Sequence, residues 1–79
     1  MKPRMGAPGN RNLVGTKVVA MRKKLGLSQK DFLARLQVHG MEISATSLSR
    51  LEGQYRLVTD HEIVIIAKVL NVEPNDLLI

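Results

Sequence analysis

Residues 25–34 of this 79-residue chain read Leu-Gly-Leu-Ser-Gln-Lys-Asp-Phe-Leu-Ala. Gly26 readily adopts the left-handed conformation in which many helices end. Ser28 is a favoured N-cap residue, and Asp31, three residues later, approximates a capping box. The stretch therefore predicts that one helix ends near Leu25 and that a second helix begins just after Ser28.

Upstream of this junction, apolar residues recur at every third or fourth position. Val14, Val18, Met21 and Leu25 share one face of a helix. This spacing predicts a first helix that begins near residues 14–16 and buries that face.

Downstream, the second helix carries an apolar stripe that stops at Leu36. Gly40 indicates a turn in the segment that follows, so the next helix is not reached at once. The apolar stripe of the helix consists of Phe32, Leu33 and Leu36. In the segment after it, Met41 and Ile43 are expected to point inward.

A third, short helix is predicted for residues 45–52, with Ser44 as its N-cap and Gly53 after its end. Its only apolar residues larger than alanine are Leu48 and Leu51. Because the apolar stripe is so narrow, most of this helix should face outward.

Thr59 and Glu62 form the T-x-x-E pattern of a capping box at the start of a fourth helix. Asn71 should end that helix, and Pro74 suits the first position of a last short one. The fold class is therefore all-α, with five short helices and no strands. The apolar face of the fourth helix comprises Ile63, Ile66, Ala67 and Leu70, widened by Val64 and Ile65.

Charge is distributed unevenly along the chain. Residues 1–35 contain nine basic residues and one acidic residue, whereas residues 36–79 contain three basic and six acidic residues. A basic half favours a polyanionic partner, although a solvated lysine-rich surface has the same composition. Residues 1–12 carry two prolines and two glycines without apolar periodicity, which predicts a flexible basic arm before a domain at 13–79.

Several function classes find little support. Phe32 and Tyr55 are the only aromatic residues, too few for a base-stacking platform. The chain has no cysteine, which fits a reducing cytoplasm, and no apolar run approaches the ~20 residues of a membrane span. His39 and His61 lack metal-ligand spacing. We therefore expect no enzyme, catalytic residue, metal, cofactor or membrane contact.

Three segments resemble the Cro- and lambda-repressor-type (XRE-type) helix-turn-helix family. Residues 25–34 are similar to its "LGLSQxxLA" segment, residues 44–52 to its recognition helix, and residues 58–78 to its closing segment. The resemblance implies a compact five-helix lambda-repressor-like domain that binds a specific double-stranded DNA sequence. It also implies a transcriptional regulator, more often a repressor than an activator, at work in the bacterial cytoplasm on the nucleoid.

Two departures from the family stand out. The connection between the second and third helices is longer than the family's usual tight turn. In addition, Ala45 stands where the family often has a long polar or basic side chain that reads a base.

By the same resemblance, Ala45, Thr46 and Arg50 occupy base-facing positions. An arginine pairs with both acceptors of guanine, and the small side chains suit a thymine methyl group. The alternatives are a phosphate contact or a plain surface charge for Arg50, and simple close approach for Ala45 and Thr46. DNA-backbone contacts are expected from Gln29, Ser44, Tyr55 and Arg56, with a solvated Gln29 and a Tyr55 packed against the domain as the alternatives. Charge alone suggests further backbone contacts from Lys2, Arg4 and Arg11 of the arm.

The resemblance further implies a structural ion pair between Arg22 and Glu52, with two independent surface charges as the alternative. It also implies a homodimer on DNA, since one short helix contacts few base pairs. We expect Leu77 and Leu78 to close the core and Ile79 to be free for a self-complementary contact. Two other functions remain open: an antitoxin or other protein-interaction module that binds a partner such as a toxin, and RNA or nonspecific nucleic-acid binding.

Overall fold

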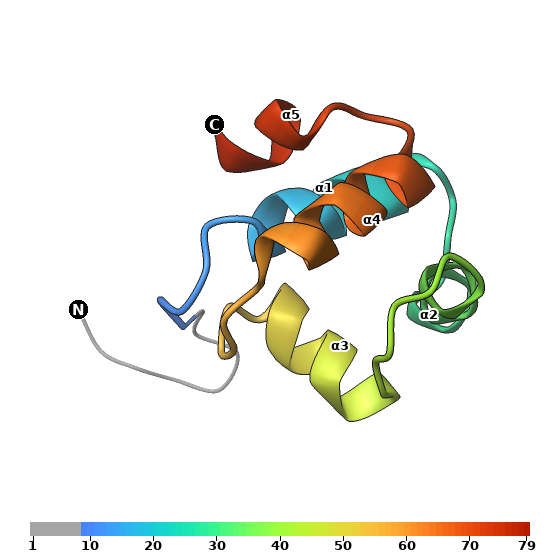
Figure 1. Ribbon diagram of the computed structural model, residues 1–79, viewed down its shortest axis with the longest axis horizontal. Helices are drawn as coiled ribbons and strands as arrows, with labels where there is room; N and C mark the ends of the chain where they lie inside the picture. Colours follow the sequence, from blue (N-terminus) through green and yellow to red (C-terminus); the bar gives the residue numbers. More distant parts are fainter. Residues whose placement is uncertain (1–8) are drawn as a thin grey trace.

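The computed structural model describes residues 9–79, and its secondary structure there is entirely helical. The elements are α1 (Gly15–Lys24), α2 (Gln29–Val38), α3 (Ala45–Glu52), α4 (Asp60–Leu70) and α5 (Pro74–Leu78). These bounds agree with the prediction of five short helices (Figure 1).

The helix ends follow from local chemistry. Ser28, Ser44 and Thr59 each accept a hydrogen bond from the backbone N–H three residues later, and Thr59 with Glu62 completes a capping box. Gly26 and Asn71 adopt the left-handed conformation after α1 and α4. These predicted start and stop signals are therefore confirmed.

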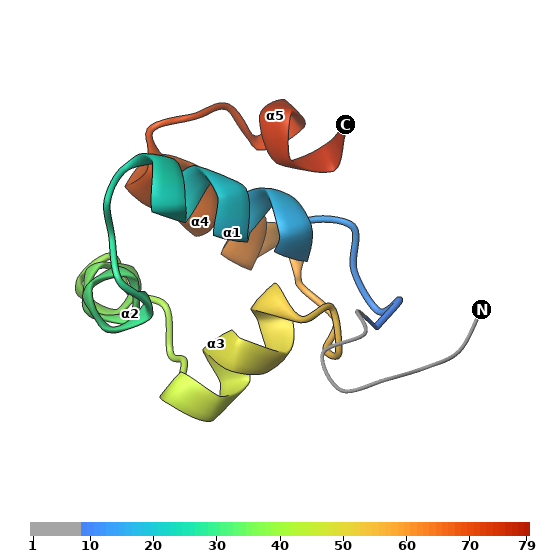
Figure 2. The same ribbon diagram turned by 180° about the vertical axis from the view of Figure 1, so that it is seen from behind.

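The helices form a small two-sided arrangement around α1 and α4, which lie side by side. In both views α3 lies on one side of this pair and α5 on the other, while α2 closes one end (Figures 1 and 2). α1 contacts α3 and α4, and α2 contacts α3 and α4. The core side chains with almost no exposed surface are Val14, Val18, Phe32, Leu36, Leu48, Leu51, Ile66, Leu70 and Leu77.

Three apolar residues are more exposed than the sequence predicts. Leu25 is 51% exposed, because α1 ends there and the side chain only borders a groove with Leu70 and Val72. Leu78 is 45% exposed, because adjacent residues of a helix point in different directions and Leu77 already faces the core. Val64 is 46% exposed, because the buried face of α4 is centred on Ile66, Ala67 and Leu70 and Val64 lies away from it. The expectation that these three side chains are buried was wrong.

The last four residues of the expected flexible arm are bound to the domain. The backbone N–H groups of Gly9 and Arg11 donate to the carbonyls of Gly53 and Gln54, at 2.8 and 2.9 Å. This part of the arm prediction is therefore corrected, and we call residues 9–12 the N-terminal clip. Lys2 and Arg4 lie outside the described residues.

Candidate nucleic-acid interface

The outward face of α3 is made of small or flexible side chains. Ala45, Thr46, Ser49 and Arg50 are exposed, while Leu48 and Leu51 are fully buried beneath them. The helix thus rests on two leucines and exposes the opposite face, as a helix that enters a DNA groove must do.

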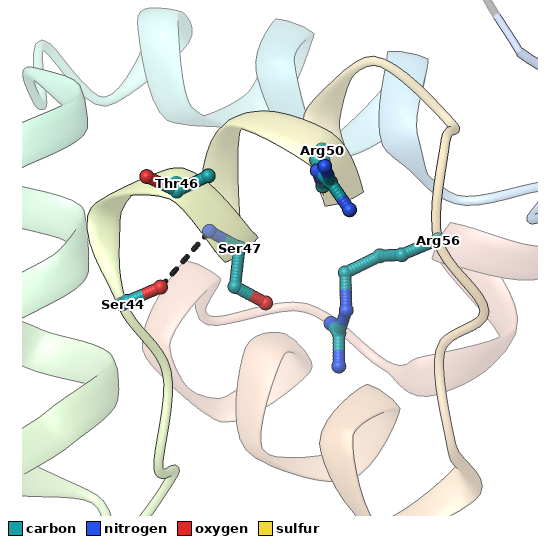
Figure 3. A pocket seen from close by; sticks show the side chains of 5 residues that line it. All are labelled: Ser44, Thr46, Ser47, Arg50 and Arg56. Atoms are coloured by element: carbon teal, nitrogen blue, oxygen red, sulfur yellow. Dashed lines mark hydrogen bonds between the residues drawn. The ribbon is translucent and has the colours of Figure 1, made fainter.

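A hollow of about 410 Å³ lies between the start of α3 and the loop after it. Arg50 lies over this hollow from α3, and Arg56 reaches across it from the loop toward α4 (Figure 3). Ser44, at its edge, accepts a hydrogen bond from the Ser47 backbone and so caps the helix. Two guanidinium groups and a helix N-terminus together make this surface attractive to anions.

Arg56 is held by an ion pair. Its Nη2 donates to Glu62 Oε2 at 2.9 Å, and its buried Nη1 has no hydrogen-bond partner among the described residues. Burial disfavours the charged form of Glu62, but hydrogen bonds from Thr59 and Arg56 and the Arg56 charge outweigh it, so the pKa of Glu62 is lowered. Arg56 is therefore fixed at the hollow and is not a freely moving surface charge.

Arg22 and Glu52 form a second, more deeply buried ion pair. Arg22 Nε and Nη2 donate to the two carboxylate oxygens of Glu52 at 2.8 and 3.1 Å, and Nη1 donates to the Leu27 carbonyl at 2.9 Å. The two side chains are only 10% and 7% exposed. This forked geometry ties the end of α3 to α1, as expected from the resemblance.

Gln29 joins this network from the first turn of α2. Its Nε2 donates to Glu52 Oε1 at 3.0 Å, and its Oε1 accepts from the Ser49 hydroxyl at 3.3 Å. The N-terminus of α2 is thereby held against α3. The Gln29 side chain is half-buried at the edge of the exposed face and is not freely solvated.

Asn12, in the N-terminal clip, is a structural residue that sequence reasoning missed. Its Oδ1 accepts from the backbone N–H groups of Val14 and Gly15, and its Nδ2 donates to the carbonyls of Leu51 and Arg56. The first pair gives an acceptor to the N–H groups of Val14, at the N-cap position of α1, and of Gly15, its first residue. The second pair spans 39 and 44 positions of sequence, and no local pattern indicates such contacts.

Glycines allow close approach at this end of α3. A side chain at Gly15 would place its Cβ 2.6 Å from the Leu51 carbonyl oxygen. The ring of Tyr55 lies against Gly53 and Gly9, where an added Cβ would come within 2.8 Å of the ring. Tyr55 thus packs against the domain with about half of its surface exposed.

Within residues 9–79, we find no cluster of three or more His, Cys, Asp or Glu side chains that could hold a metal ion. No helix in this part of the chain is both long and apolar enough to cross a bilayer.

A helix-turn-helix family model matches residues 18–77, which is most of the chain. The protein belongs to the helix-turn-helix family. This confirms the resemblance to Cro- and lambda-repressor-type domains and supports a DNA-binding domain that includes α2, α3 and α4. No curated protein and no solved structure matches the chain.

This helix-turn-helix domain has two notable features near the two ends of α3. The connection between α2 and α3 spans residues 39–44 and is anchored by buried Met41 and Ile43, as predicted. The N-terminal clip lies before the matched residues and is added to the same side of the domain as the end of α3.

Proposed function

We propose that the protein is a transcriptional regulator, more plausibly a repressor, that binds a specific double-stranded DNA sequence with α3 in the major groove. The observation that carries this proposal is the exposed face of α3. This face includes Arg50, lies beside Arg56, and is supported from below by the buried leucines Leu48 and Leu51. A regulator of this kind would act in the cytoplasm on the nucleoid.

In this proposal Arg50 pairs with a guanine, while Ala45 and Thr46 lie against thymine methyl groups. All three side chains are exposed on one helix, which supports the assignment. Gln29, Ser44, Tyr55 and Arg56 contact phosphates around the groove, together with Arg11, Lys2 and Arg4. For Arg56, which lines the hollow and whose Nη2 is bound to Glu62, the proposed contribution is the positive charge that its guanidinium group holds beside the groove.

The primary test is selection of a binding site from random duplex DNA, followed by affinity measurements at several salt concentrations. Binding should weaken steeply with salt, because each neutralised phosphate releases counterions. Arg50→Ala should flatten the preference at one base pair, by about 1–3 kcal/mol, whereas Arg56→Ala should weaken all sequences alike. Failure to enrich any sequence, or equal affinity for RNA and unrelated DNA, would reject sequence-specific binding.

We further propose that two copies bind one site as a homodimer. The C-terminal residues support this, since Leu78 and Ile79 are 45% and 77% exposed and offer an apolar surface for a self-complementary contact. Footprinting should show two protected patches about one helical turn apart. One protein per duplex at saturation would argue against the dimer, and capture of a co-encoded toxin without DNA binding would instead favour the antitoxin function.

A further inference from the structure

We propose that Asn12 is a positioning residue of the DNA-binding surface, which sets the end of α3 and the Arg56 loop in their DNA-contacting orientation. This inference rests on the proposed function. It concerns a segment that lies before the residues matched by the family, so the family match does not account for it.

The first step is the hydrogen bonding of the Asn12 side chain. It accepts from Val14 and Gly15 at 3.1 and 2.8 Å, and donates to the carbonyls of Leu51 and Arg56 at 3.2 and 2.8 Å. An asparagine amide has two donor hydrogens and an oxygen with two lone pairs. All of them are used, so the side chain is fixed in one orientation between three parts of the chain.

The second step is what these bonds do for α3. An eight-residue helix is too short to be stable alone, so its position depends on its contacts. The last carbonyls of a helix lack partners within it, and Asn12 supplies a donor to one of them at Leu51. The same side chain accepts from the Val14 and Gly15 N–H groups at the start of α1, so the start of α1 and the end of α3 are fixed relative to each other.

The third step concerns the loop after α3. Around Asn12, the N-terminal clip forms three more hydrogen bonds with this loop: Gly9 to Gly53, Arg11 to Gln54, and the Gln54 side chain to the Asn12 carbonyl, at 2.8–2.9 Å. Asn12 itself donates to the backbone carbonyl of Arg56, and Arg56 carries one of the two guanidinium groups at the hollow. The N-terminal clip therefore fixes the position of the Arg56 backbone, while Glu62 fixes the position of its guanidinium group.

The test uses Asn12→Ser in the full chain, with Asn10→Ser as the matched control. Serine retains an oxygen that can cap α1, but it is too short to donate to both Leu51 and Arg56. Asn10 is an exposed residue two positions away. With circular dichroism confirming that both variants are folded, Asn12→Ser should weaken binding to the selected duplex about tenfold, and Asn10→Ser should leave it unchanged.

A double-mutant cycle separates positioning from a general loss of stability. If Asn12 acts through the Arg56 loop, most of the affinity lost in Asn12→Ser should be absent when Arg56 is already alanine. Purely additive losses would overturn the positioning role. Should Asn12→Ser not fold, Gln54→Asn removes one bond to the clip and tolerates the left-handed backbone at this position (φ 66°); it should then weaken binding roughly threefold, and unchanged binding would overturn the role.

The two proposals fail in different ways. A wild-type protein that binds no duplex DNA rejects the proposed function. A wild-type protein that binds its site, with Asn12→Ser indistinguishable from Asn10→Ser in affinity and salt dependence, rejects only the positioning role.

Discussion

The two connections that flank α3 are held in opposite ways. The connection before it, residues 39–44, is anchored by the buried side chains of Met41 and Ile43, 4% and 8% exposed. The connection after it, residues 53–59, is held mainly by polar contacts, from Asn12 and from Glu62 through Arg56. The start of α3 is thus held by packing of buried side chains, and its end is held by hydrogen bonds. This difference predicts that salt and pH change the stability of the connection after α3. Substitutions that change side-chain volume in the core should instead change the stability of the connection before it.

The largest loss of stability should come from a substitution at the end of α3, where polar contacts hold the helix. Glu52→Ala leaves the buried Arg22 guanidinium without its partner and removes an acceptor from Gln29. We expect the free energy of unfolding to fall by about 3–5 kcal/mol, measured by urea denaturation. A double-mutant cycle with Arg22→Ala should show strong coupling, and additive losses would mean that the pair does not act as a unit.

At the apolar end, Met41→Ala should lower the free energy of unfolding by about 2–3 kcal/mol, because it leaves a cavity that the connection can only partly fill. The loss should not change with moderate salt, in contrast to the charged contacts at the other end. A salt-dependent loss, or a loss below that of an exposed control, would contradict the packing explanation.

The ion pair of Arg56 and Glu62 predicts a pH dependence. The pKa of Glu62 is lower in the folded chain, so its contribution to stability is complete above the unfolded pKa and disappears as pH falls through the folded pKa. Glu62→Gln should cost about 1 kcal/mol near neutral pH, and this difference from wild type should shrink in acid. A difference that is constant down to about pH 3 would show that the carboxylate charge is not involved.

The smallest effect is expected at Val38, which precedes the first connection and is 83% exposed. Val38→Ser should change the free energy of unfolding by less than about 0.5 kcal/mol. It also serves as the exposed control for Met41→Ala. A larger loss would show that Val38 is covered, for example by a second copy of the chain, which concentration-dependent unfolding would reveal.

The helices and most of the core were predictable because their signals are local. Capping residues such as Ser28 and Thr59 act on N–H groups three residues away, and apolar periodicity locates Phe32 and Leu36 in the core. Periodicity does not show where a buried stripe stops or how wide it is, and for this reason Leu25 and Val64 were misassigned. Leu78 was misassigned because its neighbour Leu77 alone faces the core.

The candidate site was predictable only in part. The residues on α3 and the pairing of Arg22 with Glu52 followed from the resemblance to a family. The Asn12 hydrogen bonds join segments that are far apart in the sequence, and the pairing of Arg56 with Glu62 depends on the path of an irregular loop. Neither could be predicted, because isolated polar residues in loops carry no periodic signal.

The separation of roles on α3 has a consequence for how this protein can change. Leu48, Leu51 and Glu52 hold the helix, whereas Ala45, Thr46 and Arg50 face solvent. Exposed residues of this kind can be exchanged at little cost in stability. Under the proposed function, the domain is therefore suited to retargeting, because new DNA preferences could be selected at these three positions while the residues that hold the helix are left unaltered.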